Sequence, residues 1–401
     1  MTRVMFLLAH LHKGGMQRAV SNITYALPRE FESSVAFFGT EHTDYDCRGV
    51  LYDLGSPGNI RSTLWQRANR LISRLQSIRQ LVSTVKPDVI ISFGEGAALY
   101  NLLSGAPRRI LSVRVSLKES LSDTKPLYRW LYSGLVKFTY RFADAIVCNS
   151  QQLRNEVEQW CHLQKYDKVR VIPNLFDLAE ISRKAQEPLP EPMRNVFQHP
   201  VILSVGSLIR QKSQHYLISA FERVHAKFPD VRLVLVGRGD DEAQLREQCA
   251  DLKLSDYVVF AGYQTNPYAF MARCRLFVLP SLYEGLPNAL IEAMACGAPV
   301  ISADCPTGPR EILAPGTPLE SRLEDQIEVG QFGTLVPTCD VSTALQLKER
   351  AAILAEAIHS YLADPERSAS FSRLSMERAA DFSADRISQR WADLLSIQGD
   401  P

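Results

Sequence analysis

Long hydrophobic runs are missing from this 401-residue sequence, and no apolar stretch approaches the roughly 18 residues that a membrane-spanning helix needs. The first apolar stretch, residues 4–11, is much shorter and continues directly into His12, Lys13 and two glycines. It indicates a first β-strand rather than a signal peptide. From these features we expect a cytoplasmic protein.

The cysteines and the charge balance exclude further classes of protein. The eight cysteines are scattered and form no Cys-x-x-Cys pair, so we expect neither a zinc site nor a disulfide framework, and a reducing compartment is indicated. The formal net charge of +1 gives no general attraction to nucleic acid. With 46% hydrophobic and 22% charged residues the composition is globular, and the length suffices for two or three domains.

Short apolar strands, glycine-containing turns and helical stretches alternate along the chain, which predicts an α/β fold. Continuous apolar strands such as residues 88–93 (DVIISF) are typical of a parallel sheet covered on both faces. The proline-rich stretch 175–200 lacks strong periodicity and is interpreted as an interdomain linker. We therefore expect two doubly wound domains, residues 1–174 and 201–383, with a cleft between them.

Residues 280–313 combine a turn, a helix start and two carboxylates after a predicted strand, in the sequence PSLYEGLPNALIEAMACGAPVISADCPTGPREIL. Glu284 precedes the helix and Glu292 lies on it, so the two carboxylates should reach different parts of one ligand. Helix-start N–H groups in the turn, which contains Gly285, Leu286, Pro287 and Asn288, favour a phosphate. A diphosphate between two hydroxyl-rich groups fits this layout. On spacing alone, an ordinary crossover with solvated glutamates remains an alternative.

Other strand-end loops carry glycine and basic residues. Gly14 and Gly15 follow the first strand, but the full dinucleotide-binding pattern is missing, and a tight turn that needs glycine for steric reasons is an alternative to a phosphate contact. The loop 206–212 (GSLIRQK) contains Arg210 and Lys212, which suit a phosphate clamp. Further strand ends are predicted at Gly237 and before Tyr263.

Two stretches of the N-terminal half are basic and amphipathic. Residues 61–86 contain six basic residues, no acidic residue and an apolar stripe at helical spacing. Residues 128–142 form a second basic and aromatic helix. Such helices bind membrane surfaces, but a surface helix with solvated arginines gives the same pattern. Glu95 and Arg114 follow two predicted strands of this half and should line the cleft.

With these motifs in order, the chain resembles the retaining glycosyltransferases of family four, which have the GT-B architecture of two Rossmann-like domains. The resemblance spans almost the whole chain. Its motifs are GGMQR at 14–18, VIPN at 171–174, GSLIRQK at 206–212, LVGRG at 235–239, EGLPNALIE at 284–292, DCPTGPREIL at 304–313 and GTLVP at 333–337. The resemblance implies that the last helix, residues 384–401, crosses back to the N-terminal domain, with Trp391 as an anchor.

The resemblance also implies roles for individual residues. Glu284 would bind sugar hydroxyls, Glu292 the ribose, and Lys212 the leaving diphosphate, while main chain near Tyr263 would meet the base. Other residues on the nucleotide-sugar side are Gly15, Gly206, Ser207, Gly237, Gly285, Leu286, Pro287 and Asn288, and the acceptor side has Arg18, Glu95 and Arg114. Two positions depart from the family pattern: Ser207 replaces an arginine, for which Arg210 is the expected substitute, and Arg114 stands near a usual histidine.

The implied reaction is transfer of a hexose or N-acetylhexosamine from a nucleoside-diphosphate sugar, with UDP expected, to a lipid-linked glycan with retention of configuration. The resemblance to enzymes of bacterial surface glycans points to the inner face of the cytoplasmic membrane. Helix-start N–H groups and the basic residues Arg210 and Lys212 can take the place of a cation at a diphosphate, so no metal and no cofactor besides the nucleotide sugar are expected. Two alternatives are a nucleotide-sugar epimerase or hydrolase of this fold and a non-catalytic subunit that binds glycan or nucleotide.

Overall fold

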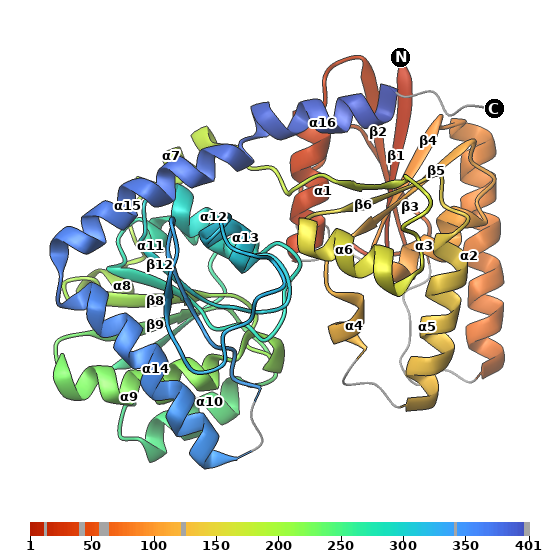
Figure 1. Cartoon of the computed structure of the whole chain (residues 1–401). Helices are drawn as coiled ribbons and strands as arrows, with labels where there is room; N and C mark the ends of the chain where they lie inside the picture. The colour runs from red at the N-terminus through yellow and green to blue at the C-terminus, as the bar shows by residue number, and fades with distance from the viewer. Residues whose placement is uncertain (12–13, 40–44, 56–63, 122–125, 341–342, 397–401) are drawn as a thin grey trace. The chain divides into compact units, whose positions relative to one another are not determined.

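The computed structural model describes residues 1–11, 14–39, 45–55, 64–121, 126–340 and 343–396. The chain divides into two compact units (Figure 1). Unit 1 comprises Met1–Leu175 and Ala384–Pro401, and unit 2 comprises Phe176–Ser383. Across the described part of the chain, no helix combines the length and apolar character that crossing a membrane requires.

Unit 1 is built on a parallel seven-stranded sheet with the order β3-β2-β1-β4-β5-β6-β7. The order reverses between β1 and β4, which is the position where ligands bind in doubly wound sheets. Its strands are β1 (Thr2–Leu8), β2 (Phe31–Phe37), β3 (Val50–Asp53), β4 (Val89–Phe93), β5 (Arg108–Val113), β6 (Ala145–Cys148) and β7 (Val169–Val171). Its helices are α1 (Gly15–Ala26), α2 (Leu64–Val85), α3 (Glu95–Leu102), α4 (Leu117–Ser120), α5 (Pro126–Tyr140), α6 (Gln151–Trp160) and α16 (Ala384–Ser396).

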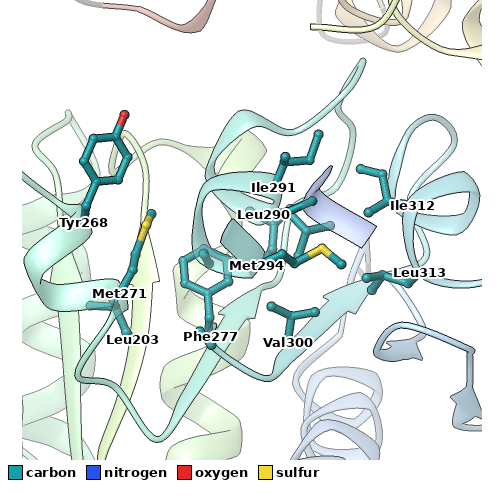
Figure 2. Packing of buried hydrophobic residues seen from close by; sticks show 14 of the residues in the cluster. Leu203, Tyr268, Met271, Phe277, Leu290, Ile291, Met294, Val300, Ile312 and Leu313 are labelled. Carbon is teal, nitrogen blue, oxygen red and sulfur yellow. The ribbon is translucent and has the colours of Figure 1, made fainter. Parts of the chain in front are cut away.

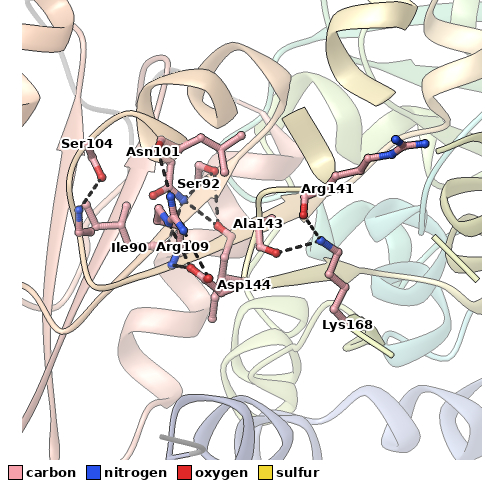
Figure 3. A network of polar contacts seen from close by, with 12 residues as sticks. Ile90, Ser92, Asn101, Ser104, Arg109, Arg141, Ala143, Asp144 and Lys168 are labelled. Carbon is pink, nitrogen blue, oxygen red and sulfur yellow. Dashed lines mark hydrogen bonds and ion pairs between the residues drawn. The ribbon is translucent and has the colours of Figure 1, made fainter. Parts of the chain in front are cut away.

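Polar side chains fasten the strands of unit 1 to one another (Figure 3). Asn101 of α3 donates hydrogen bonds to the carbonyl oxygens of Ile90 (3.1 Å) and Ile110 (2.9 Å), on the neighbouring strands β4 and β5. Asp144, just before β6, accepts from the backbone N–H (2.7 Å) and the Nε (3.2 Å) of Arg109 on β5. These contacts fix the strands whose carboxyl ends carry Glu95 and Arg114.

Unit 2 repeats the same arrangement, with the order β10-β9-β8-β11-β12-β14-β13. The strand β13 is antiparallel, and the order reverses between β8 and β11. Its strands are β8 (Val201–Val205), β9 (Arg232–Val236), β10 (Val258–Gly262), β11 (Leu276–Leu279), β12 (Val300–Ala303), β13 (Glu328–Val329) and β14 (Thr334–Val336). Its helices are α7 (Leu178–Ala185), α8 (Glu191–Val196), η1 (Arg210–Lys212), α9 (Gln214–Lys227), α10 (Glu242–Asp251), α11 (Tyr268–Met271), α12 (Asn288–Ala295), α13 (Pro309–Leu313), α14 (Ala344–Leu362), α15 (Pro365–Ala379) and η2 (Ala380–Phe382).

A buried cluster anchors α12 to the sheet of unit 2 (Figure 2). Leu290, Ile291 and Met294 of α12 pack with Phe277 of β11 and Val300 of β12. All five side chains are fully buried, and each such burial contributes on the order of 2 kcal/mol. The helix that carries Glu292 is therefore rigidly positioned.

The stretch 175–200 differs from the expected linker. It contains α7 and α8, whose apolar residues Ile181 and Leu189 belong to the buried core of unit 2. The prolines misled the prediction, because Pro190 directly precedes α8 and proline is compatible with a helix start. The predicted last helix corresponds to α16, which begins at Ala384, and the extended residue Ser383 separates it from η2.

Candidate functional site

The candidate site of unit 2 lies where the strand order reverses, at the carboxyl ends of β8 and β11. The loop after β8 ends in η1 with Lys212, and the turn after β11 contains Glu284. The Nζ of Lys212 lies 2.5 Å from the Oε1 of Glu284. Glu284 is buried, whereas Lys212 keeps about a fifth of its side chain exposed (22%). The sequence prediction placed both residues at strand ends, and the structure brings them into contact.

Backbone contacts hold the same two loops together. The Nε2 of Gln211 donates to the carbonyl oxygen of Tyr283 (2.8 Å), and the N–H of Leu282 donates to the carbonyl oxygen of Gln211 (2.8 Å). The position of the Glu284 carboxylate is therefore fixed by main-chain geometry as well as by its ion pair. Sequence reasoning missed Gln211, because a glutamine in a loop carries no distinctive pattern.

Gly237 is required for the close approach of the β8 and β9 loops. Its φ is +147°, and a Cβ at this position would lie 1.9 Å from the carbonyl oxygen of Gly206. The N–H of Gly206 donates to the carbonyl oxygen of Val236 (2.9 Å), so the two loops are bonded as well as packed. The backbone of the predicted glycine loop thus packs directly against the loop after β9. The loop also lies beside Lys212, whose side-chain carbons would be 3.7 Å from a Cβ on Gly206.

Glu292 lies on α12 and is almost fully buried. The hydroxyl of Tyr268, on α11, donates to its Oε1 at 3.5 Å. Pro287 is the N-cap of α12, and the helix begins at Asn288. Gly285 and Leu286 are buried in the turn that precedes α12. This buried turn joins the N-terminus of α12 directly to Glu284.

Three other predicted residues of this side are exposed. Ser207 is exposed, and its carbonyl oxygen accepts from the Nε2 of Gln214 (2.9 Å). The side chain of Arg210 is exposed and its Nη2 lies 3.4 Å from the Oδ1 of Asp340. Tyr263 follows β10 and is also exposed. The ion pair of Arg210 is with Asp340, and its role at a diphosphate stays a prediction.

Arg114, predicted on the acceptor side of unit 1, is buried at the end of β5. Its Nε donates to Ser112 (2.7 Å) and its Nη1 to the Oδ1 of Asn174 (2.6 Å), and its guanidinium stacks on Phe93 at 4.8 Å from the ring centre and lies 5.8 Å from that of Trp391. Burial lowers the pKa of the Arg114 guanidinium to about 9, so it remains protonated at neutral pH. Arg114 therefore ties α16 and the end of the first chain segment into unit 1.

The other acceptor-side residues lie at neighbouring strand ends. Glu95 begins α3, and the Tyr140 hydroxyl donates to its Oε1 at 3.4 Å. Burial raises the pKa of the Glu95 carboxyl. Gly15 begins α1, and Arg18 lies one turn further along it. The methyl group of Met16 on α1 would lie 3.1 Å from a Cβ on Gly94, so the turns after β1 and β4 meet at the reversal point of unit 1.

A metal site would need several His, Cys, Asp or Glu side chains close together. Among the residues that the structure describes, no group of three or more His, Cys, Asp or Glu side chains is arranged to hold a metal ion. All eight cysteines are free thiols. Burial raises the pKa of the Cys47 thiol to about 11 and that of Cys296 to about 12, which keeps both thiols protonated at neutral pH.

Comparison with known proteins identifies the family. Residues 13–180 match the model of Glycosyltransferase Family 4, and residues 191–322 match that of Glycosyl transferases group 1. An uncharacterised glycosyltransferase of Methanocaldococcus jannaschii is 31% identical over 346 residues, which cover 81% of this chain and 83% of that protein.

Two further similarities concern a bacterial enzyme and a solved structure. The Campylobacter jejuni N-acetylgalactosamine-N,N'-diacetylbacillosaminyl-diphospho-undecaprenol 4-alpha-N-acetylgalactosaminyltransferase is 34% identical over 179 residues, 44% of this chain and 46% of that enzyme. The crystal structure of Anabaena Alr3699/HepE in complex with UDP-glucose superposes with a TM-score of 0.74 at 19% identity, covering 99% of this chain and all of that one. With two Rossmann-like units and matches to both family models, this chain belongs to the family-four glycosyltransferases of GT-B fold.

Proposed function

We propose that this glycosyltransferase moves a hexose or N-acetylhexosamine from a UDP-sugar to a lipid-linked glycan, with retention at the anomeric carbon. The observation that carries the proposal is the Lys212–Glu284 pair at the reversal point of unit 2. It offers a cation for a diphosphate and a carboxylate for sugar hydroxyls within one site. The similar structure that holds UDP-glucose supports UDP as the nucleotide.

In this proposal the nucleotide sugar is held along α12. Glu284 accepts hydrogen bonds from the sugar hydroxyls, and Glu292, with Tyr268 beside it, binds the ribose. The N-terminus of α12 and Lys212 face the diphosphate. The glycine at position 237 lets the loops after β8 and β9 pack beside Lys212, and main chain near Tyr263 meets the base.

The proposed chemical step separates charge in a defined direction. The bond from the anomeric carbon to the diphosphate oxygen breaks, the acceptor oxygen forms the new bond on the same face, and the acceptor proton passes to the diphosphate. Lys212 and the α12 N-terminus stabilise the negative charge on the leaving group, which supports a metal-independent reaction. Arg114 is not the base in this step, because its guanidinium stays protonated.

The proposed acceptor is a glycan on a polyprenyl diphosphate in surface-polysaccharide biosynthesis. The name of the similar Campylobacter enzyme, which specifies a diphospho-undecaprenol acceptor, supports this choice. Arg18, Glu95 and Arg114 remain the proposed acceptor-side residues. The orphaned buried Nη2 of Arg114, which finds no hydrogen-bond partner among the described residues, is the donor most suited to an anionic group.

Unit 1 carries a surface that suits a lipid acceptor, and we propose that it contacts the inner face of an anionic membrane. On α5 and at Phe142, two residues beyond its end, an apolar stripe at helical spacing is exposed, with Trp130 at 72% and Phe138 at 61%. The stripe comprises Trp130, Leu131, Leu135, Phe138 and Phe142. Residues 126–142 contain Arg129, Lys137 and Arg141 and no acidic residue. Aromatic anchors flanked by basic residues are typical of interfacial helices.

Nucleotide release tests the enzymatic proposal. The purified chain is incubated with a panel of UDP- and GDP-sugars, with and without polyprenyl-diphosphate-linked glycans. We expect UDP release that requires the acceptor, and loss of transfer in Glu284→Ala. Release without acceptor would instead indicate a hydrolase or epimerase, and full activity of Glu284→Ala would overturn the assignment of the site.

Flotation with anionic liposomes tests the membrane proposal. Arg70, Arg74 and Arg79 on α2 are replaced together by Glu, because α2, like α5, is basic and carries no acidic residue. We expect binding to fall, since each basic residue near an anionic surface contributes about 1 kcal/mol. Unchanged flotation would remove α2 from the membrane contact.

A further inference from the structure

We infer that Thr307 is a positioning residue for Glu284, and that a buried ion pair between Arg310 and Asp304 holds Thr307 in place. The inference rests on the proposed role of Glu284 for its catalytic consequence, but not for its structural one. It concerns the loop between β12 and α13, whose sequence DCPTGPR joins the two charged residues.

The loop contacts the same turn that carries Glu284, the partner of Lys212. The Thr307 hydroxyl donates a hydrogen bond to the carbonyl oxygen of Glu284. The next residue, Gly308, has φ +94°, and a Cβ there would lie 2.6 Å from the carbonyl oxygen of Gly285 and 2.7 Å from the Cδ of Pro287. Only a glycine allows this approach. The Glu284 turn therefore contacts both the loop after β8 and the loop after β12.

Charge fixes the β12 loop itself. The Arg310 side chain is fully buried (0% exposed), and it makes a bidentate pair with Asp304, Nε to Oδ1 at 3.0 Å and Nη2 to Oδ2 at 2.6 Å. Its Nη1 donates to Thr317 (2.9 Å) and lies 3.0 Å from a carboxylate oxygen of Glu328 on β13. The N–H of Leu323 also donates to Asp304 (3.0 Å).

This network has more polar contacts than an ordinary helix start needs. A buried ion pair is weak evidence for stability, because desolvation offsets much of the attraction. Its attested use is to select one arrangement, since a bidentate arginine tolerates little displacement. Here the arrangement it selects places Thr307 and Gly308 against the Glu284 turn. A displacement of about 1 Å of a reacting group costs up to about 100-fold in rate, so such support matters for the reaction.

Thr307→Val tests the inference, because it removes the hydroxyl and keeps the shape. Hydrogen exchange of the peptide that covers residues 282–287 is measured without ligand, with Thr307→Ser as the conservative variant. We expect exchange to rise about five- to tenfold in Thr307→Val and to return in Thr307→Ser. Ser372→Ala is the matched control, since the Ser372 hydroxyl donates to the Gly297 carbonyl (2.6 Å), elsewhere in unit 2. Unchanged exchange in Thr307→Val would overturn the positioning role.

Kinetics with the best nucleotide sugar of the panel form the second readout. We expect Thr307→Val to lower kcat about tenfold, with less change in KM, and to have no further effect in a Glu284→Gln background, because the two residues act as one unit. Additive effects would contradict coupling through Glu284. Faster exchange combined with full activity of Glu284 variants would leave the structural role standing and refute the proposed function instead. Arg310→Lys, which keeps the charge but not the bidentate pair, should loosen the same peptide.

Discussion

The two units of this chain share one sheet topology but expose different chemistry. Of the eighteen large hydrophobic side chains that are exposed in the described part of the chain, fourteen belong to unit 1 and four to unit 2. Unit 2 buries the two carboxylates of its candidate site, Glu284 and Glu292. Unit 1 instead presents basic and aromatic residues on α5. One scaffold therefore supports a small, charged site in unit 2 and a broad apolar and basic surface in unit 1.

The cations at the strand ends show the same contrast. Lys212 in unit 2 is partly exposed and pairs with a carboxylate. Arg114 in unit 1 is buried and bonds neutral partners, Ser112 and Asn174. A partly exposed lysine can exchange its partner for a phosphate with little rearrangement. The arginine serves the packing of its unit, and no more than one of its nitrogens remains for a ligand.

Removal of the unit 2 cation, Lys212, should have the largest effect on activity. Lys212→Ala should lower kcat by about 100- to 1,000-fold, because a charge that stabilises the leaving diphosphate is lost. Lys212→Arg keeps the charge and should retain more activity. Steady-state kinetics at saturating nucleotide sugar give the comparison, with the unfolding midpoint of each variant as the control. Equal activity of the alanine variant and the wild type would contradict the proposal that Lys212 stabilises the leaving diphosphate.

Backbone packing supplies a second test, with a glycine from each unit. Gly237→Ala in unit 2 should lower the free energy of unfolding by about 2–4 kcal/mol, since the Cβ would clash with the Gly206 carbonyl. Gly96→Ala in α3 of unit 1 meets no atom within 4 Å and should stabilise that helix by about 0.5–1 kcal/mol. Urea denaturation measures both. Similar effects at the two sites would show that the tight loop packing is not specific to unit 2.

The apolar surface of unit 1 gives a third test. Replacing Trp130 and Phe138 by Ser should weaken vesicle binding about tenfold, because two exposed aromatic anchors are lost. The matched control is Leu345→Ser on α14 of unit 2, which is equally exposed and should have no effect. Sedimentation with anionic vesicles at high salt isolates the apolar contribution from the electrostatic one. If Leu345→Ser weakens vesicle binding as much, the exposed residues of α5 are not a specific membrane contact.

The smallest effect concerns Glu95. Burial raises the pKa of this carboxyl, so between its usual pKa and the raised one the folded protein holds a proton that the unfolded chain has released. The protonated Glu95 carboxyl therefore favours the folded state at low pH, and this contribution to the free energy of unfolding is lost as the pH rises from the usual pKa to the raised one. Glu95→Gln does not titrate and should be more stable than the wild type at pH 7, by less than about 1 kcal/mol. The difference should shrink as the pH is lowered, and a difference independent of pH would contradict the account.

The fold was predictable from the sequence because parallel strands buried on both faces leave continuous apolar runs. The strand predicted at residues 88–93 is β4, Val89–Phe93. The predicted linker was wrong because four prolines outweighed the short apolar pattern of α7, which becomes meaningful only when Ile181 is seen in the core.

The site was predictable where its chemistry resides in one motif and not where it depends on contacts between distant segments. The spacing of Glu284 and Glu292 and the basic residue of the glycine loop pointed to one candidate site, and the structure brings Lys212 and Glu284 into contact there. The contact of Thr307 with the Glu284 turn crosses 23 positions of the chain, and that of Tyr268 with Glu292 crosses 24. Serine, threonine and tyrosine occur at many surface positions, so their types alone do not reveal such partners.

The most direct test is hydrogen exchange of the intact chain, measured alone, with UDP and with anionic vesicles. It tests whether unit 2 binds the nucleotide while unit 1 binds the membrane. We expect UDP to give its largest protection in peptides covering residues 206–213 and 282–292 of unit 2. Vesicles should protect the peptide 126–142 of unit 1 and leave the unit 2 peptides unchanged. Protection of unit 1 alone by UDP, or of unit 2 alone by vesicles, would contradict the central claim that the two units meet different partners.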